Sequence, residues 1–96
     1  MKIDFNRSNG ELTIALDGRL DSLTAPVLED FLAGQYAGAT SLTFDFAKLA
    51  YVSSAGLRVL LTAHKRMKGA MKLTNISELI MEILEVTGFA DVWEIA

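Results

Sequence analysis

Two adjacent serines are the feature of this chain whose type and spacing most suggest chemistry. Ser53 and Ser54 lie between an apolar segment that ends at Val52 and another that begins at Leu57. A serine at the start of a helix accepts a hydrogen bond from a free N–H of the first turn, which contributes about 1 kcal/mol. The same place also suits a phosphate, because free N–H groups and the helix dipole favour negative charge there. Capping and phosphorylation both remain open.

The phosphate interpretation does not require the fold to change. A phosphoserine adds about −1.5 to −2 charges at neutral pH, so the surface changes while the helix keeps its start. Gly56 fits either interpretation, since a residue without a side chain lets a partner approach the backbone closely.

Signatures of catalysis are absent from the sequence. It contains none of the patterns GxxxxGK[ST], GxGxxG, GxSxG and HExxH. His64 is the only imidazole and there is no cysteine, whereas a metal site or an activated nucleophile normally needs more than one such group. We therefore expect no enzyme, no cofactor and no metal, and we expect His64 to be structural.

Charge limits the classes of partner. Nine basic and twelve acidic residues give a formal net charge of −3, which provides no general attraction to nucleic acid or anionic lipid. We expect neither as a partner, and no segment has the apolar length of a signal peptide or a membrane span. A chain without cysteine suits a reducing compartment, so we expect the cytoplasm.

One region is basic, through Arg58, Lys65, Arg66 and Lys68. We interpret it as a solvated helix face, with a recognition surface as the alternative.

The strands that would position the serines follow from alternating apolar residues. The length of 96 residues predicts one domain over residues 1–96. Strands are predicted over residues 2–7, 11–16, 41–46 and 70–75, with a turn at 8–10. The tail, residues 91–95, is open between a last strand and a helical turn.

The helices follow from apolar residues at helical spacing. Ser22 or Thr24 can cap the first helix. Pro26 is tolerated there, because the N–H groups of a first helical turn are unpaired. The second is predicted over residues 54–68, with Gly69 placed to end it.

A third helix is predicted to begin with a variant capping box, in which Asn75 precedes Glu78, and to close near Gly88. Strands and helices that alternate along the chain indicate an α/β domain. We expect a mixed sheet of four to five strands with the helices packed mainly on one face.

Three segments resemble the STAS domains of bacterial anti-sigma factor antagonists. They cover residues 16–32, 42–68 and 76–95 in the order of the family. The most specific part is the (D/S)-S-x-G-L pattern that contains Ser54, and G-x-L-D at 18–21 supports it. The resemblance implies a partner-switching regulator. Its unmodified form binds an anti-sigma factor that is also a serine kinase, phosphorylation abolishes binding, and a serine phosphatase restores it.

The position in this motif implies that Ser54 is phosphorylated, with Ser53 as the alternate. The resemblance also places Asp21 on the binding surface and Gly18 in support of the turn beneath it. The partner-binding residues that it implies are Asp21, Ser22, Thr24, Ser53, Ser54, Ala55, Gly56 and Arg58.

One position departs from the family pattern. Ser53 stands where well-known members carry an acid directly before the phosphoserine, so both serines remain candidates. A member with this change could also bind its partner without a switch. STAS domains also resemble accessory subunits of lipid-transport ATPases, so the alternative function that the resemblance implies is a non-switching STAS accessory subunit of a lipid-transport ATPase complex. The sequence leaves the oligomeric state open.

Overall fold

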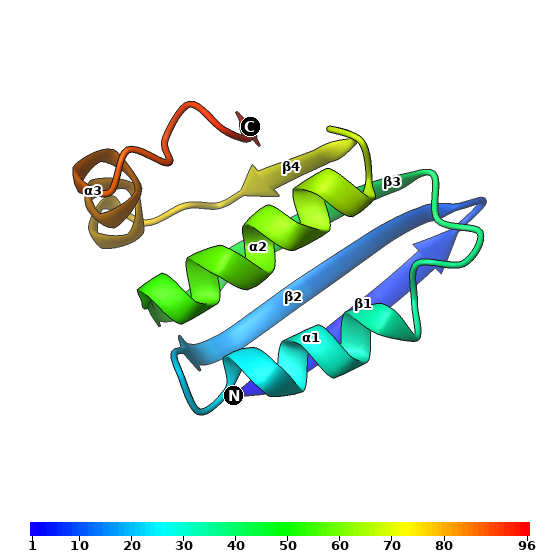
Figure 1. The fold of residues 1–96 in the computed structure, drawn as a ribbon, viewed down its shortest axis with the longest axis horizontal. Coiled ribbons are helices and arrows are strands. Elements are labelled where there is room, and N and C mark those ends of the chain that lie inside the picture. Colours follow the sequence, from blue (N-terminus) through cyan, green and yellow to red (C-terminus); the bar gives the residue numbers. More distant parts are fainter.

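The chain forms five strands and three helices, and the computed structural model describes every residue from Met1 to Ala96. The elements in chain order are β1 (Lys2–Ser8), β2 (Glu11–Leu20), α1 (Ala25–Ala33), β3 (Ser41–Val52), α2 (Ser54–Arg66), β4 (Met71–Thr74), α3 (Glu78–Val86) and β5 (Glu94–Ile95) (Figure 1). The predicted α/β class is confirmed.

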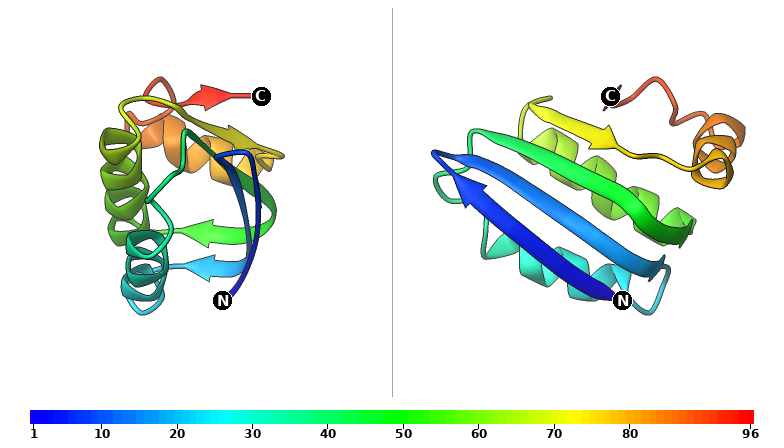
Figure 2. Two further views of the ribbon diagram at one scale, coloured as in Figure 1. Left: turned by 90° about the vertical axis from the view of Figure 1, so that its right-hand side faces the viewer. Right: turned by 180° about the vertical axis from the view of Figure 1, so that it is seen from behind.

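The five strands form one mixed sheet in the order β1-β2-β3-β4-β5. β1 is antiparallel to β2, and the other neighbours are parallel. α1 and α2 lie side by side on one face of this sheet, and the opposite face carries no helix (Figure 2). This arrangement confirms the prediction of a mixed sheet with helices mainly on one face.

The core lies between the sheet and the two helices. Alternate residues of the two central strands face the helices, because successive side chains of a strand point to opposite faces. From these strands and helices the fully buried large side chains are Leu12, Ile14, Leu16, Leu20, Leu28, Leu32, Leu42, Phe44, Phe46, Leu57 and Leu60. No polar or charged residue is buried, so any polar chemistry belongs to the surface.

β2 and β3 run further than the sequence predicts. Their parallel pairing shifts in register between Ala15 and Asp17 and again after Gly18, which interrupts the alternation that marks a strand. Gly18 lies inside β2, two residues before the strand ends at Leu20, and its φ of +114° is a conformation that favours glycine. The extended pairing brings Leu20 opposite Val52. The two segments that follow these strands therefore start close together.

The last turn of α2 is shorter than predicted. The helix ends at Arg66 rather than residue 68, and Lys68 and Gly69 adopt φ values of +53° and +86°. Gly69 donates its N–H to the carbonyl of His64 at 3.0 Å, which is the kind of contact expected when a glycine ends a helix.

The predicted start of α3 is wrong in its capping residue. Ser77, not Asn75, precedes the helix, and its hydroxyl accepts the N–H of Ile80 at 3.2 Å. Asn75 instead has φ +55° and donates its amide to Asp45 at 2.9 Å. The helix ends at Val86, two residues before Gly88.

The C-terminal segment returns to the sheet and packs on α2. The open alternative for residues 91–95 is resolved as a turn at Asp91 and Val92 followed by the short strand β5, which pairs parallel to β4. Trp93 is buried and meets the ring of His64 edge to face, with centroids 6.5 Å apart. His64 therefore packs against the tail. None of the three helices has the length and apolar character needed to cross a bilayer.

Candidate functional site

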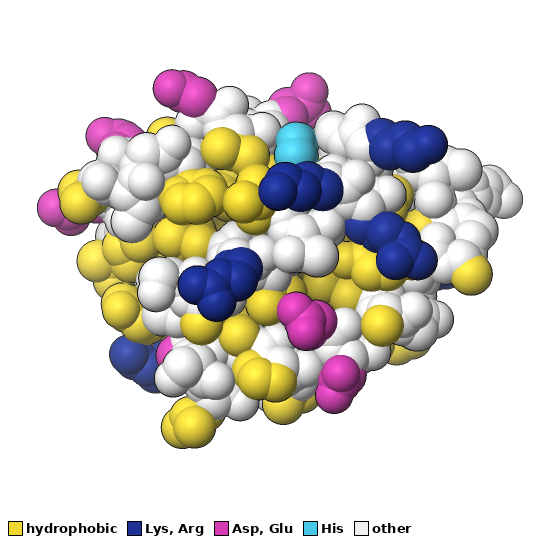
Figure 3. Space-filling model, in the orientation of Figure 1, with side chains coloured by type: hydrophobic (Ala, Val, Ile, Leu, Met, Phe, Trp, Pro, Cys, Tyr) yellow, Lys and Arg dark blue, Asp and Glu magenta, His cyan; other side chains and the backbone are white.

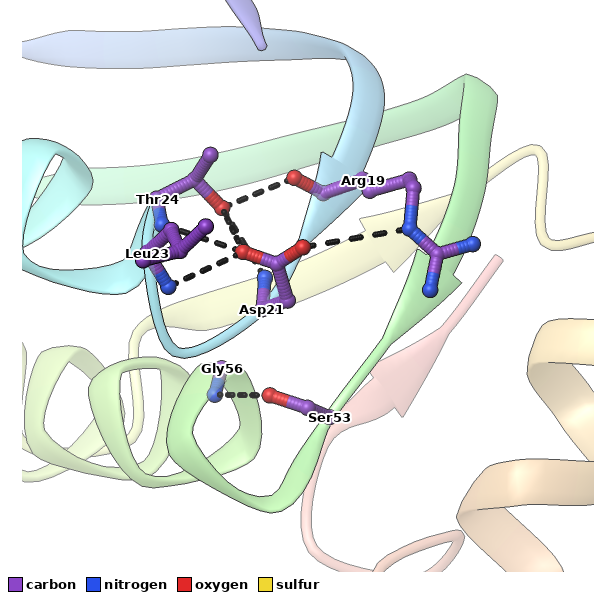
Figure 4. A network of polar contacts seen from close by, with 6 residues as sticks. All are labelled: Arg19, Asp21, Leu23, Thr24, Ser53 and Gly56. Atoms are coloured by element: carbon purple, nitrogen blue, oxygen red, sulfur yellow. Dashed lines mark hydrogen bonds and ion pairs between the residues drawn. The ribbon is translucent and has the colours of Figure 1, made fainter.

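The start of α2 is built by Ser53. Its backbone is extended, with φ −95° and ψ 175°, and its hydroxyl accepts the N–H of Gly56 at 3.3 Å (Figure 4). Its own N–H donates to the carbonyl of Leu20 at 2.9 Å, which joins the helix start to the end of β2. Ser53 is half-buried. Its hydroxyl therefore has the capping role that the sequence left open between the two serines.

Ser54 differs from Ser53 in its place in the helix, its exposure and its hydrogen bonding. It is the first residue of α2, it is exposed, and its hydroxyl forms no hydrogen bond within the protein. The N–H groups of Ser54 and Ala55 have no backbone partner, as expected for the first turn of a helix. An enzyme can therefore reach this hydroxyl without breaking the cap.

Gly56 is explained by packing inside the protein. A Cβ on this residue would lie 2.7 Å from Leu20 Cγ and 2.9 Å from both the Leu20 carbonyl oxygen and Val52 Cγ2. Gly56 is buried, so close contact of α2 with β2 requires the glycine. This corrects our interpretation that the missing side chain serves the approach of a partner.

Asp21 organises the loop between β2 and α1. One of its carboxylate oxygens accepts the N–H groups of Leu23 at 3.0 Å and Thr24 at 3.1 Å (Figure 4). The Thr24 hydroxyl donates to the carbonyl of Arg19 at 2.8 Å and accepts the Asp21 N–H at 2.9 Å. The loop is thus held by its own side chains beside the start of α2.

These contacts set the charge of Asp21. The Thr24 N–H is the largest influence and holds the pKa of the Asp21 carboxyl below its ordinary value of 3.8, against a smaller opposing effect of desolvation. The Leu23 N–H and the Arg19 guanidinium also lower this pKa. Arg19 Nε lies 3.8 Å from the second carboxylate oxygen. Asp21 is therefore ionised at neutral pH and already has a partner.

The remaining predicted site residues divide into exposed and half-buried positions. Thr24 precedes α1, but its hydroxyl does not cap that helix. The Ser22 side chain is exposed and does not cap it either. Ala55 is half-buried, whereas Arg58 is exposed one turn after Ser54. Hydrogen bonding through Leu20 thus brings the two predicted segments, 21–24 and 53–56, next to each other.

Two exposed apolar residues in this part of the chain were not predicted from the sequence. Leu23 is 83% exposed in the middle of the loop, and Val27 of α1 is 55% exposed four residues later. A leucine in an otherwise polar turn is a signal that could have indicated them. Exposed apolar side chains of this kind are suited to contact a protein partner.

The wider face around this site has a characteristic distribution of side chains. Lys and Arg side chains follow the course of α2, and hydrophobic side chains gather between α2 and α3 (Figure 3). Nowhere do three or more His, Cys, Asp or Glu side chains come together as a metal-binding group. The surface has the means to contact a protein through charge and apolar area.

Comparisons with known proteins agree with this geometry. A family model described as "Mlab, STAS domain" matches residues 3–94. BtrV of Bordetella bronchiseptica, which is provisionally named an anti-sigma factor antagonist, is 33% identical over 100% of this chain and 86% of its own length. The anti-sigma-B factor antagonist of Bacillus subtilis is 26% identical over 100% of this chain and 91% of its own.

The fold also matches a solved structure. The anti-sigma factor antagonist SpoIIAA in its unphosphorylated form superposes with a TM-score of 0.84 at 16% identity, over 99% of this chain and 88% of that one. The two curated relatives are named as regulators and not as enzymes. The family model covers nearly the whole sequence, and the chain belongs to the STAS domain family.

Proposed function

We propose that this protein is an anti-sigma factor antagonist that phosphorylation of Ser54 controls. The observation that carries the proposal is the contrast between two neighbouring hydroxyls, since Ser53 caps α2 while Ser54 is exposed and unbonded. Relatives named as antagonists support it. SpoIIAA has been solved in a phosphorylated as well as an unphosphorylated form. This role would place the protein in the cytoplasm, with proteins as its partners.

The proposed partner in the unmodified state is an anti-sigma factor that is also a serine kinase. In the modification step, Ser54 Oγ attacks the γ-phosphorus of ATP held by the kinase. The new O–P bond forms as the bond to ADP breaks, and the hydroxyl proton passes to a base of the kinase. A serine phosphatase reverses the change by hydrolysis, which returns the hydroxyl and releases inorganic phosphate.

The docking surface consists of the loop after β2 and the exposed start of α2. Its proposed residues are Asp21, Ser22, Thr24, Ser53, Ser54, Ala55 and Arg58, with Leu23 and Val27 added from the structure. Gly56 holds this surface together from below. A dianion buried against a partner has a desolvation cost and repels acidic groups, and about 3 kcal/mol weakens binding more than a hundredfold.

Phosphorylation does not require α2 to move. The cap comes from Ser53, whose bond to Gly56 does not involve the Ser54 side chain. Negative charge at the first residue of a helix also interacts favourably with the dipole. The modified protein therefore keeps its fold, and only its docking surface changes.

The test is to incubate the protein with ATP and the serine kinase that binds its unmodified form, and to locate the phosphate by mass spectrometry. We expect modification of the parent and of Ser53→Ala, and none of Ser54→Ala. The Ser53→Ala variant is the matched control, since it removes the adjacent hydroxyl. A kinase that binds the protein but never modifies Ser54 would refute the proposal.

The second candidate is a non-switching accessory subunit of a lipid-transport ATPase complex. The family model supports this candidate, because the description of the model names MlaB rather than an anti-sigma factor antagonist. Such a subunit would dock through the same surface without modification. Affinity purification with the unmodified protein separates the two functions, since a bound kinase supports the first and a bound transporter ATPase supports the second.

A further inference from the structure

Arg58 lies one helical turn after Ser54. Residues four apart on a helix are neighbours on its surface, and both of these are exposed on α2. Side chains of a helix lean toward its N-terminus, so the Arg58 side chain extends over the turn that contains Ser54. At this spacing the Arg58 guanidinium can reach the Ser54 side chain.

Arg58 has no anionic partner in the unmodified protein. The ion pairs of the molecule are Lys2 with Asp4 and Arg19 with Asp21, and α2 contains no acidic residue. In the neighbouring loop, Asp21 is occupied by Arg19 and by two backbone N–H groups (Figure 4). Arg58 is therefore a free cation beside the proposed phosphorylation site.

We infer that Arg58 pairs with the phosphate of modified Ser54 within the same helix. This inference rests on the proposed function and adds a second effect to the switch. Modification introduces a dianion and also removes a free guanidinium from the docking surface. An acidic group of a partner that contacts Arg58 in the unmodified state would lose that contact at the same moment that it meets the phosphate.

The chemistry of the pair favours this arrangement. A guanidinium presents its N–H donors in a planar fork that matches two phosphate oxygens, and such charge-assisted bonds are stronger than neutral ones. Arg19 is a poor rival, because it pairs with Asp21 and stacks on Tyr51 at 4.4 Å from the ring centroid.

Lys65 is a matched control for Arg58. It is exposed on the same helix and carries the same charge. Because each residue of a helix advances about 1.5 Å, it lies roughly 16 Å from Ser54 along the axis and cannot contact a phosphate there. Replacing either residue by glutamine changes the net charge equally, and only one replacement removes the proposed pair.

The experiment uses the full chain with phosphoserine incorporated at position 54 during translation. The second pKa of the phosphate, about 6 for free phosphoserine, is measured from the pH dependence of its ³¹P shift. A guanidinium favours the dianion and lowers this pKa, so we expect Arg58→Gln to raise it by roughly 0.5. We expect Lys65→Gln to leave it nearly unchanged. The helix start acts equally on the phosphate in all of these proteins and cancels in the comparison.

The inference is overturned if the two glutamine variants give the same pKa, whether shifted or not. Arg58→Lys sharpens the result, because it keeps the charge without the planar fork and should give an intermediate value. Since the phosphate is installed without a kinase, this result is separate from the proposed function. A kinase that ignores Ser54 would refute that function and leave the titration intact.

Discussion

The segments that lead into the neighbouring helices α1 and α2 are built in different ways. Before α1, the Asp21 carboxylate accepts two backbone N–H groups and the Thr24 hydroxyl makes two further bonds, so the polar groups of the loop are largely satisfied. Before α2, Ser53 supplies a single capping bond and Ser54 remains free. The first start is a scaffold. The second combines a fixed backbone with an unused hydroxyl, which is what a reversible modification needs.

The start of α2 is also joined to the end of β2, directly before the loop that leads into α1. Ser53 donates its N–H to Leu20 at the end of β2, and Gly56 packs on the same residue. A partner that binds residues 21–24 therefore finds residues 53–56 in a fixed position beside them. This connection gives several ways to test whether the division into scaffold and switch is real.

The largest effect on stability is expected from Gly56→Ala. The added Cβ would lie 2.7 Å from Leu20 Cγ, and overpacking of this kind costs about 1–3 kcal/mol. Because one of the three close contacts is to the Leu20 carbonyl oxygen at 2.9 Å, we expect a cost in the upper half of this range. Alanine favours a helix by about 1 kcal/mol, so urea unfolding should show a net loss of about 1–2 kcal/mol. Gly34→Ala is the control, since its nearest neighbour would be 3.7 Å away. A Gly56→Ala protein as stable as the parent would mean that the two starts are not tightly packed.

The next effect separates the two serines. Ser53→Ala removes the hydroxyl that caps α2 and should lower the free energy of unfolding by about 1 kcal/mol. Ser54→Ala removes an exposed, unbonded hydroxyl and should stay within about 0.5 kcal/mol of the parent. Thermal and urea unfolding of both variants measure this difference. Equal losses, or a larger loss for Ser54→Ala, would reverse the assignment of cap and switch.

A smaller effect is expected on the pH dependence of stability, through Asp21 in the loop before α1. Hydrogen bonds from Thr24 and Leu23 lower the folded-state pKa of Asp21 below 3.8. A carboxyl with a lowered folded-state pKa adds stability that is complete above its unfolded value and is lost as pH falls through its folded value. Asp21→Asn should therefore lose less stability than the parent between neutral pH and about pH 3.

The comparison for this pH effect is Asp45. Its pKa is also lowered, chiefly by the Asn75 amide and then by the Ala47 N–H. Asp45→Asn should flatten the acid dependence in the same direction while leaving the loop before α1 intact. An unchanged acid dependence in Asp21→Asn would show that the loop is not held by this carboxylate.

Much of the fold could be predicted because its apolar spacing is regular. Leu12, Ile14 and Leu16 alternate as expected for β2 and are buried. The regularity fails where β2 and β3 change register, which is why their last residues were not predicted as strand. The site depends on this missed part, since Leu20 and Val52 bring its two segments together.

The local polar roles were harder to predict. Asn75 and Ser77 are both good capping residues, and only the backbone decides between them, because Asn75 adopts a left-handed conformation and bonds to Asp45. The adjacent serines present the same ambiguity at α2. Gly56 shows a third kind of limit, since its close neighbour Leu20 is far away in the sequence.

In the proposed switch, charge on the Ser54 side chain decides whether the partner binds. The most direct measurement is the dissociation constant of the partner kinase, without nucleotide, for the unmodified protein and for the protein with phosphoserine at position 54. We predict that Ser54→Ala binds like the parent and that the phosphorylated protein binds more than a hundredfold more weakly, about 3 kcal/mol. Equal affinity of the phosphorylated and unmodified proteins would contradict control of binding by charge on Ser54.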